Sequence, residues 1–374
     1  MNNRYENLEF RTVSLKGSHY EIGKQLAMKL ANYKRFRPRL ISKKISFTGS
    51  KFRNINEILE LYDSYCPGII DEMQGFADES GNSLDCLSIF DIPKSRQYNC
   101  SQFAVLGKKT ENGSTYIGRS YDYHYSDEDL ILMKTKVNHK YSHIGFSMNG
   151  FGRPDGINSS GLVITMAGGG AWDAPWTNLK SFHYYIAIRS LLDNCKSVDE
   201  AVGNLIEMPV CTSTNYLIVD TSHKAALVEG FDSTYEVKFI SDESPESFLY
   251  STNYYKQKKM EKYNKFINPW LMECNKAREK ALKKILENRG VKISKESLKT
   301  LIKNEIPDGL SSLYFEEWFG TLWSMFFDLD NRSVEVCFGP PSLNPYHYFS
   351  LDKDFEEKKF EVDILNKKSN FLSK

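Results

Sequence analysis

Cys100 is the residue whose surroundings most directly suggest chemistry. It stands at the join between a helical leader and the first strand-like run of the chain. The Asn112-Gly113 pair supplies the positive φ angles that a tight hairpin turn needs, so the strand at 118–123 is expected to return beside Cys100. This pairing would bring Arg119 and Asp122 next to the thiol. A guanidinium and a hydrogen-bonded carboxylate favour a thiolate, so the hairpin indicates a reactive cysteine.

Structural roles for the same residues stay open at this point. A single cysteine is more often a small buried hydrophobic residue than a nucleophile. Asp122 is equally suited to capping a turn or to pairing with Arg119. The seven cysteines have wide, irregular spacings and no CxxC pair, which predicts mostly buried thiols in a reducing compartment.

The elements that would position Cys100 change type along the chain. Apolar residues at helical spacing indicate that residues 1–90 are mainly helical, as in the runs 22–30 and 55–62. Runs of alternating and β-branched residues between turn signals then predict a β-rich middle. The expected strands are at 101–107, 114–123, 142–148, 161–167, 216–220, 225–230 and 236–240.

Helices and a final hairpin are expected in the rest of the chain. Ser197 and Glu200 form a capping box, and Asn268 followed by Pro269 marks another helix start. The many lysines and glutamates of this last helix suggest a solvated face. The expected elements are helices at 182–195, 197–208 and 268–289 and a closing hairpin of 320–328 with 334–338. This order predicts a layered α+β domain rather than alternating βαβ units.

Several short motifs follow one another in the order of a known enzyme family. They are Cys-Ser-Gln-Phe at 100–103, Gly-Arg-Ser-Tyr-Asp-Tyr at 118–123, Asp-Gly-Ile-Asn-Ser-Ser-Gly-Leu at 155–162 and Asn-Tyr-Leu-Ile-Val-Asp at 215–220. Lys-Gly-Ser-His-Tyr-Glu-Ile-Gly at 16–23 and Gly-Thr-Leu-Trp-Ser at 320–324 fit the same order. The sequence thus resembles the N-terminal-nucleophile (Ntn) hydrolases of the isopenicillin N acyltransferase (acyl-CoA:penicillanic acid acyltransferase) family, related to choloylglycine hydrolases and penicillin V acylases.

The resemblance implies a four-layer αββα fold and self-cleavage between Asn99 and Cys100. Residues 1–99 would form a helical leader that becomes a small chain of roughly 11 kDa, and residues 100–374 a catalytic large chain of roughly 32 kDa. Together the two would form one globular domain. Cleavage would turn the amide nitrogen of Cys100 into an amine with a pKa of about 8, which is suited to accept the thiol proton.

The resemblance also implies roles for individual residues. Cys100 would attack an amide or acyl thioester carbonyl, and water or an acceptor amine would resolve the acyl-enzyme. Asp122 and Arg119 would hold the amine and the thiol, while Asn215 would help to stabilise the oxyanion. No histidine is then required. Trp172 and Trp176 are expected either to line an apolar acyl pocket or to belong to the core.

The sequence departs from the family pattern at two places. One is the residue before Cys100, and the other is the segment that would bind the oxyanion. Asn99 stands where related acyltransferases often have glycine. Residues 168–170 are all glycine where choloylglycine hydrolases carry an asparagine, so backbone N–H groups would have to replace its side chain. The later arginine of those hydrolases is not assigned from the sequence.

Composition excludes several classes of protein. The chain of 374 residues has 49 basic and 48 acidic side chains, so nothing draws it to nucleic acid or to an anionic membrane. No uncharged apolar run reaches the length of a membrane span, and we expect a cytoplasmic protein. His139 and His143 have the spacing of a zinc pair but lack its glutamate, so we expect two surface histidines. No metal and no cofactor is predicted, and the oligomeric state is open, a homo-oligomer included.

Three functions are compatible with these observations. The first is an autoproteolytic acyltransferase or amidohydrolase with Cys100 as its N-terminal nucleophile. The second is an uncleaved cysteine hydrolase in which a histidine such as His124 acts as the base. The third is a non-catalytic binding protein on the same fold, whose ligand binding would survive loss of the thiol.

Overall fold

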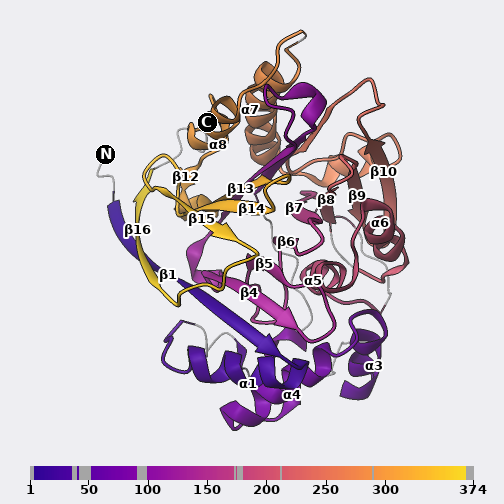
Figure 1. Cartoon of the computed structure of the whole chain (residues 1–374), viewed down its shortest axis with the longest axis vertical. Helices are drawn as coiled ribbons and strands as arrows, with labels where there is room; N and C mark the ends of the chain where they lie inside the picture. Colours follow the sequence, from indigo (N-terminus) through magenta and orange to yellow (C-terminus); the bar gives the residue numbers. More distant parts are fainter. Residues whose placement is uncertain are drawn as a thin grey trace.

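Two β-sheets packed face to face form the centre of the molecule, as the computed structural model shows (Figure 1). It describes residues 4–35, 40–41, 52–90, 99–171, 174, 180–210, 213–288 and 290–367. None of the helices in these ranges combines the length and apolarity that a membrane span requires.

The first sheet has nine strands in the order β10-β9-β8-β7-β6-β5-β4-β1-β16. All neighbours pair antiparallel except β1 and β4, which are parallel. The strands are β1 (Arg4–Gly17), β4 (Ile131–Val137), β5 (His143–Phe146), β6 (Asp155–Asn158), β7 (Val163–Gly168), β8 (Ser213–Val219), β9 (Ala225–Phe231), β10 (Thr234–Ile240) and β16 (Lys359–Asn366).

The second sheet has seven strands in the order β11-β2-β3-β13-β14-β15, with β12 also paired to β13. They are β2 (Ser101–Val105), β3 (Tyr116–Tyr123), β11 (Phe248–Ser251), β12 (Leu313–Tyr314), β13 (Phe319–Asp328), β14 (Ser333–Phe338) and β15 (Tyr346–Ser350). The β2–β3 and β13–β14 hairpins confirm two hairpins predicted from the sequence.

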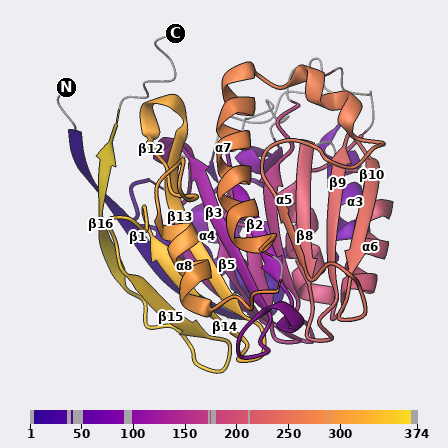
Figure 2. The ribbon, with the colours of Figure 1, turned by 90° about the horizontal axis from the view of Figure 1, so that it is seen from above.

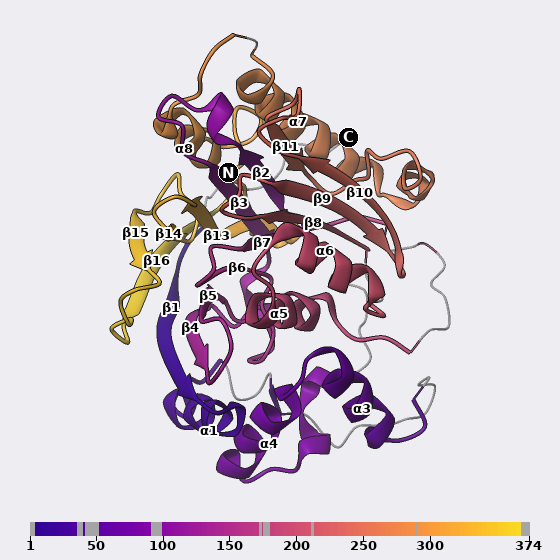
Figure 3. The ribbon, with the colours of Figure 1, turned by 45° about the vertical axis from the view of Figure 1, so that its right-hand side comes forward.

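Helices cover the outer face of each sheet. The helices α5 (Tyr184–Asn194) and α6 (Val198–Glu207) pack on the first sheet, and α7 (Pro269–Leu286) and α8 (Lys295–Lys303) on the second. Figure 2 shows α7 and α8 in front of the strands, and Figure 3 shows the layers in succession, from α7 through both sheets to α5 and α6. The predicted four-layer αββα arrangement is confirmed. Short 3₁₀ turns lie at Leu84–Cys86, Ser88–Phe90, Gly107–Lys109, Tyr125–Asp127, Glu261–Phe266 and Phe315–Glu317.

Polar side chains join the sheets as well as apolar ones. Gln102 of β2 donates to the carbonyl oxygen of Asn215 on β8 (2.9 Å) and accepts from the Thr165 hydroxyl on β7 (2.6 Å). All three residues are fully buried. Because a buried amide without partners is costly, these bonds select one alignment of the second sheet on the first.

The leader is helical where its apolar spacing predicts, at α1 (His19–Leu30), α3 (Ile55–Tyr65) and α4 (Ile69–Ser80). Its first part is different, because β1 is a long strand inserted between β4 and β16. The alternation of buried Leu8 and Phe10 with less buried neighbours is the strand pattern that the sequence analysis did not use. The leader therefore supplies an interior strand of the first sheet.

Two glycines allow α1 and α4 to cross at close range. A Cβ at Gly23 would lie 1.8 Å from the carbonyl oxygen of Glu72, and one at Gly75 would lie 2.1 Å from that of Tyr20. Each glycine thus faces the backbone of the other helix. This contact closes the leader into a compact pair at the lower end of the molecule in Figure 1.

A buried ionic network ties this helix pair to α5. Arg189 donates to Glu72 of α4 through Nη1 (3.1 Å) and Nη2 (2.8 Å), and to Asp193 through Nε (2.8 Å). His143 lies 3.1 Å from Asp193 and is completely buried, so the expectation that it is a surface histidine is wrong. Burial lowers the pKa of His143 to about 4, and the carboxylate of Asp193 only partly opposes that decrease.

We expect Gly75→Ala to lower the free energy of unfolding by about 1–3 kcal/mol, because the new methyl group forces two helix backbones apart. The measurement is urea unfolding followed by circular dichroism. Gly203→Ala in α6 is the matched control, since a Cβ there meets nothing within 4 Å, and it should raise stability by up to about 1 kcal/mol. Equal effects of the two substitutions would contradict the close crossing.

Candidate active site

Cys100 directly precedes β2, the first strand of the hairpin that the sequence predicts. Register places Ser101 opposite Ser120 and Gln102 opposite Arg119, and the N–H of Asn99 donates to the carbonyl oxygen of Asp122 (3.1 Å). The thiol is fully buried. The hairpin therefore brings Cys100, Arg119 and Asp122 together, as expected.

Asp122 is the acidic group of the site and has three side-chain partners. Its Oδ1 accepts hydrogen bonds from the hydroxyls of Ser120 and Thr321, each at 2.7 Å. Its Oδ2 lies 3.5 Å from Nη1 of Arg278. Burial raises the pKa of Asp122 to about 6, and Arg278 and the two hydroxyls oppose that shift. The carboxylate is thus ionised at neutral pH and titrates at mildly acidic pH.

Arg278 of α7 is a site residue that the sequence analysis missed. Its Nη1 donates to the carbonyl oxygens of Asn99 (3.2 Å) and Cys100 (3.0 Å). Its Nη2 donates to the side-chain oxygens of Asn253 (2.8 Å) and Asn275 (2.6 Å). A completely buried guanidinium therefore binds the carbonyl groups on both sides of the Asn99–Cys100 junction.

The interpretation of the 268–289 helix as a solvated face is correct for only part of its surface. One stripe of α7 is buried at helical spacing, and it carries the guanidinium into the site. That stripe consists of Leu271, Cys274, Asn275, Arg278, Ala281, Leu282 and Leu286. An Asn and an Arg three residues apart within an otherwise apolar stripe are the signal that could have identified Arg278.

Arg119 pairs with Asp155 of β6 and not with Asp122. Its Nε donates to Asp155 (2.6 Å), and its Nη1 donates to the carbonyl oxygen of Met166. The indole N–H of Trp323 donates to the same Asp155 oxygen (3.0 Å). Nη2 of Arg119 is buried and has no hydrogen-bond partner among the described residues. One N–H pair of this guanidinium is therefore available to a group that enters the site.

The environment of Cys100 does not favour a thiolate, so the expectation drawn from its neighbouring residues is wrong for this structure. Burial raises the pKa of the thiol to about 11, although the nearby guanidinium of Arg119 acts against that increase. Asp122 adds to the increase through its negative charge. At neutral pH the thiol is mostly protonated, so its attack on a carbonyl has to be coupled to transfer of the thiol proton.

Asn215 lies beside the site and binds backbone in this arrangement. Its Nδ2 donates to the carbonyl oxygens of Thr252 (2.9 Å) and Tyr254 (3.1 Å). Between these two lies Asn253, a ligand of Arg278. Asn215 thus holds the segment that orients the guanidinium, and its part in stabilising an oxyanion stays a prediction. Trp172 and Trp176 lie outside the described residues.

His124, the base of the alternative mechanism, follows β3. Its ring stacks on Tyr125 at 4.4 Å between centroids and lies 4.8 Å from the ring of Trp318. Nδ1 is 2.7 Å from the hydroxyl of Ser126. These contacts place the imidazole in an aromatic cluster next to the site, and burial lowers its pKa.

The site therefore combines a buried thiol, a carboxylate and two guanidinium groups around one peptide bond. A carbonyl placed there would meet a nucleophile and positively charged donors. This is the set of groups that acyl transfer through a thioester needs. Among the described residues, no cluster of three or more His, Cys, Asp or Glu side chains could hold a metal ion.

Comparisons with known proteins found similar solved structures. Among solved structures, the chain is similar to penicillin V acylase from Agrobacterium tumefaciens, with 17% identity, a TM-score of 0.41, and coverage of 68% of this chain and 87% of that one. It is also similar to a mutant of conjugated bile acid hydrolase from Clostridium perfringens, with 13% identity, a TM-score of 0.42, and coverage of 70% and 97%. No curated protein matches the chain.

The family match covers most of the elements around the site, but it begins after Cys100 and β2. Residues 108–343 match the family described as acyl-coenzyme A:6-aminopenicillanic acid acyl-transferase. This range is well over half of the chain and includes Arg119, Asp122, Asn215 and Arg278. The protein belongs to the acyl-coenzyme A:6-aminopenicillanic acid acyl-transferase family.

Proposed function

We propose that this protein cleaves itself between Asn99 and Cys100 and then acts as an acyltransferase or amidohydrolase with Cys100 as its N-terminal nucleophile. The observation that carries the proposal is the bond from Arg278 to the carbonyl oxygen of Asn99 (3.2 Å), directly beside the thiol. Its substrates are small acyl amides or acyl thioesters.

Self-cleavage begins with attack of the Cys100 sulfur on the carbonyl carbon of Asn99. The negative charge that develops on the carbonyl oxygen is stabilised by the guanidinium of Arg278. The C–N bond then breaks, the nitrogen of Cys100 takes the thiol proton, and a thioester joins Asn99 to the sulfur. Water hydrolyses this thioester, which leaves a carboxylate on Asn99 and an amine on Cys100.

The same groups then serve the enzymatic cycle. A freed α-amine has a pKa of about 8 and can take the proton of a thiol that burial keeps protonated. The sulfur attacks the substrate carbonyl, and the amine returns the proton to the leaving group. Water or an acceptor amine resolves the acyl-enzyme. Asp122 and Arg119 orient the amine and the thiol. Asn215 would donate to the oxyanion after releasing one of the two carbonyl oxygens that its Nδ2 binds.

The two pieces are expected to remain one globular unit after cleavage. Strand β1 of the leader lies between β4 and β16 of the large chain. The buried pair of Glu72 and Arg189 also crosses this boundary, with an N–O distance of 2.8 Å. Separation would expose two strand edges and a buried ion pair, so residues 1–99 should dissociate only under denaturing conditions.

The first test is the intact mass of the denatured protein, for wild type and Cys100→Ala. Wild type should give two fragments that meet at Asn99 and Cys100, because the thiol is the attacking group. Cys100→Ala should give one full-length mass. Cys66→Ala, which removes another buried cysteine, should leave cleavage intact.

A single full-length mass for wild type would overturn the mature N-terminal-nucleophile mechanism. Activity of that intact chain which is lost in His124→Ala would then support the uncleaved hydrolase. Ligand binding that survives Cys100→Ala without any turnover would instead support the binding protein.

Arg278→Lys should slow self-cleavage by about a hundredfold, because an ammonium group cannot reach the junction carbonyls and the two asparagines together. The measurement is the rate at which the mass of residues 100–374 forms after cell-free synthesis. Arg53→Lys is the matched control at an exposed arginine. An unchanged rate in Arg278→Lys, with the thermal midpoint also unchanged, would exclude a role for Arg278 in cleavage.

The cleavage rate should fall as the pH drops through about 6. The raised pKa of Asp122 means that its carboxylate binds a proton in that range, and a neutral carboxyl no longer balances Arg278 or attracts the forming amine. The rate should therefore be full above pH 7 and low below pH 5. In Asp122→Asn the rate should be low throughout, and an inflection near pH 6 in this variant would assign the titration to another group.

A further inference from the structure

Asn99 makes hydrogen bonds through its N–H, its carbonyl oxygen and its side chain, although cleavage requires only that the carbonyl be bound. Its N–H donates to the carbonyl oxygen of Asp122 (3.1 Å), and its carbonyl oxygen accepts from Arg278 (3.2 Å). Its side-chain Nδ2 donates to the carbonyl oxygen of Trp318 (2.9 Å). The residue is 2% exposed. Three fixed groups therefore bind the acyl residue of the junction, one of them through the side-chain Nδ2, whereas the side-chain oxygen has no partner among the described residues.

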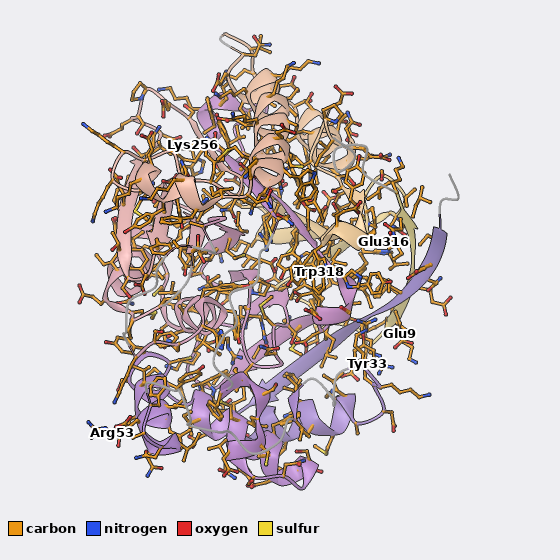
Figure 4. The ribbon with its side chains drawn as sticks, turned by 180° about the vertical axis from the view of Figure 1, so that it is seen from behind. Glu9, Tyr33, Arg53, Lys256, Glu316 and Trp318 are labelled. Atoms are coloured by element: carbon orange, nitrogen blue, oxygen red, sulfur yellow. The ribbon has the colours of Figure 1, made fainter. Side chains whose placement is uncertain are left out.

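The Trp318 carbonyl is held in place by an unusual turn. Trp318 has a φ of 58°, in the left-handed region that residues other than glycine rarely adopt. Its N–H donates to the carbonyl oxygen of Phe315 (3.1 Å), and its ring lies 5.3 Å from the ring of Tyr123. The turn thus aims a main-chain acceptor at residue 99 while the indole stays 43% exposed. Figure 4 labels Trp318 in the view from behind.

All three partners of Asn99 belong to the large chain and persist after cleavage. When Asn99 leaves, the carbonyl oxygens of Asp122 and Trp318 lose a donor and Arg278 loses an acceptor. A buried polar group without a partner costs about 1–3 kcal/mol. A ligand that restores the three hydrogen bonds is therefore favoured over one that restores only the bond to Arg278.

The substrate has to enter this same place. One sulfur attacks both the junction carbonyl and the substrate carbonyl, and productive attack needs the reacting atoms about 3–3.5 Å apart. The carbonyl group of Asn99 is bonded directly to the nitrogen of Cys100 and is bound by Arg278. The acyl group of a substrate thus takes the position that Asn99 leaves.

We propose, on the basis of the function proposed above, that the mature enzyme selects N-acylaminoacyl donors whose side chain carries a carboxamide. The reacting carbonyl accepts from Arg278, the α-N–H donates to the Asp122 carbonyl, and the side-chain N–H donates to the Trp318 carbonyl. A plain arylacetyl or fatty acyl group lacks both donors. Of the three hydrogen bonds, such a group keeps only the one from Arg278 to its carbonyl oxygen.

The test compares donors that share one leaving group on the processed wild-type enzyme. The donors are aminomethylcoumarin amides of N-acetylasparagine, N-acetylleucine, N-acetylaspartate and phenylacetic acid. Leucine and aspartate side chains have nearly the shape of asparagine but carry no N–H donor, while the α-N–H is the same in all three. We expect kcat/KM for the asparagine donor to exceed the others about tenfold or more.

Trp318→Gly distinguishes the contribution of the main-chain carbonyl from that of the indole ring. Glycine removes the ring but adopts a positive φ freely, so the main-chain acceptor is kept. The preference for asparagine over leucine should persist in this variant within a factor of about three. Loss of the preference would assign it to the indole and overturn the proposal. An equal or higher kcat/KM for the leucine or phenylacetyl donor in wild type would overturn it as well, while leaving the proposed function standing.

A second measurement covers the outcome in which no amide is turned over. Thioesters of the same four acyl groups are incubated with the processed enzyme, and acylation of Cys100 is followed by intact mass. Faster acylation by the asparaginyl thioester supports the proposal, and equal or slower acylation overturns it. Failure of all four thioesters to modify Cys100 would overturn the proposed function, and this inference with it.

Discussion

The charge of Arg278 is the constraint around which the site is organised. A guanidinium removed from water is tolerated only if its N–H groups find acceptors, and here Asn253, Asn275 and the carbonyl groups of Asn99 and Cys100 provide them. Asp122 supplies a countercharge at 3.5 Å. Because these acceptors and the countercharge come from α7, β3, the residues just before β2 and the segment after β11, satisfying one charge aligns four parts of the second sheet and its covering helix.

A second buried charge performs the same task at the boundary between the leader and the body. Arg189 is shared by Glu72 and Asp193, so α4 and α5 are joined by bonds that would be lost together. The Arg189 guanidinium lowers the pKa of Glu72 against the effect of burial. This pair is then stable at neutral pH and weakens as acid protonates the carboxylate. The leader is in this way part of the folded body.

Burial of the thiol explains why an activating step is needed. A cysteine with a pKa of about 11 is mostly protonated at neutral pH and attacks slowly without a base, and the neighbouring Asp122 adds to that effect. Arg119 alone does not reverse it, since two of its nitrogens are bound to Asp155 and Met166. Under the proposed mechanism, cleavage supplies the missing base at the place where it is needed. Burial of the thiol then creates the need for a base that the N-terminal amine meets.

The sequence alone determined the local features of this protein. Asn268 with Pro269 started α7 through local backbone geometry. The pairing of β2 with β3 was predicted correctly, but residues 106–115 connect the strands in a longer loop, in which Gly113 and not Asn112 has a positive φ. Motif order indicated the family, and the hairpin brought Cys100, Arg119 and Asp122 together. The β1 strand of the leader was overlooked, since its partners β4 and β16 lie far along the chain.

The tertiary structure decided which charged groups meet. Arg278 and Asn99 are 179 positions apart, and no local pattern connects them; they meet because α7 packs its buried stripe on the second sheet. Arg119 pairs with Asp155 rather than Asp122 because the two sheets face each other, which a single hairpin cannot reveal. Side-chain pKa values depend on burial by such distant elements. The sequence therefore identified the candidate nucleophile, and the packing of sheets and helices determined what surrounds it.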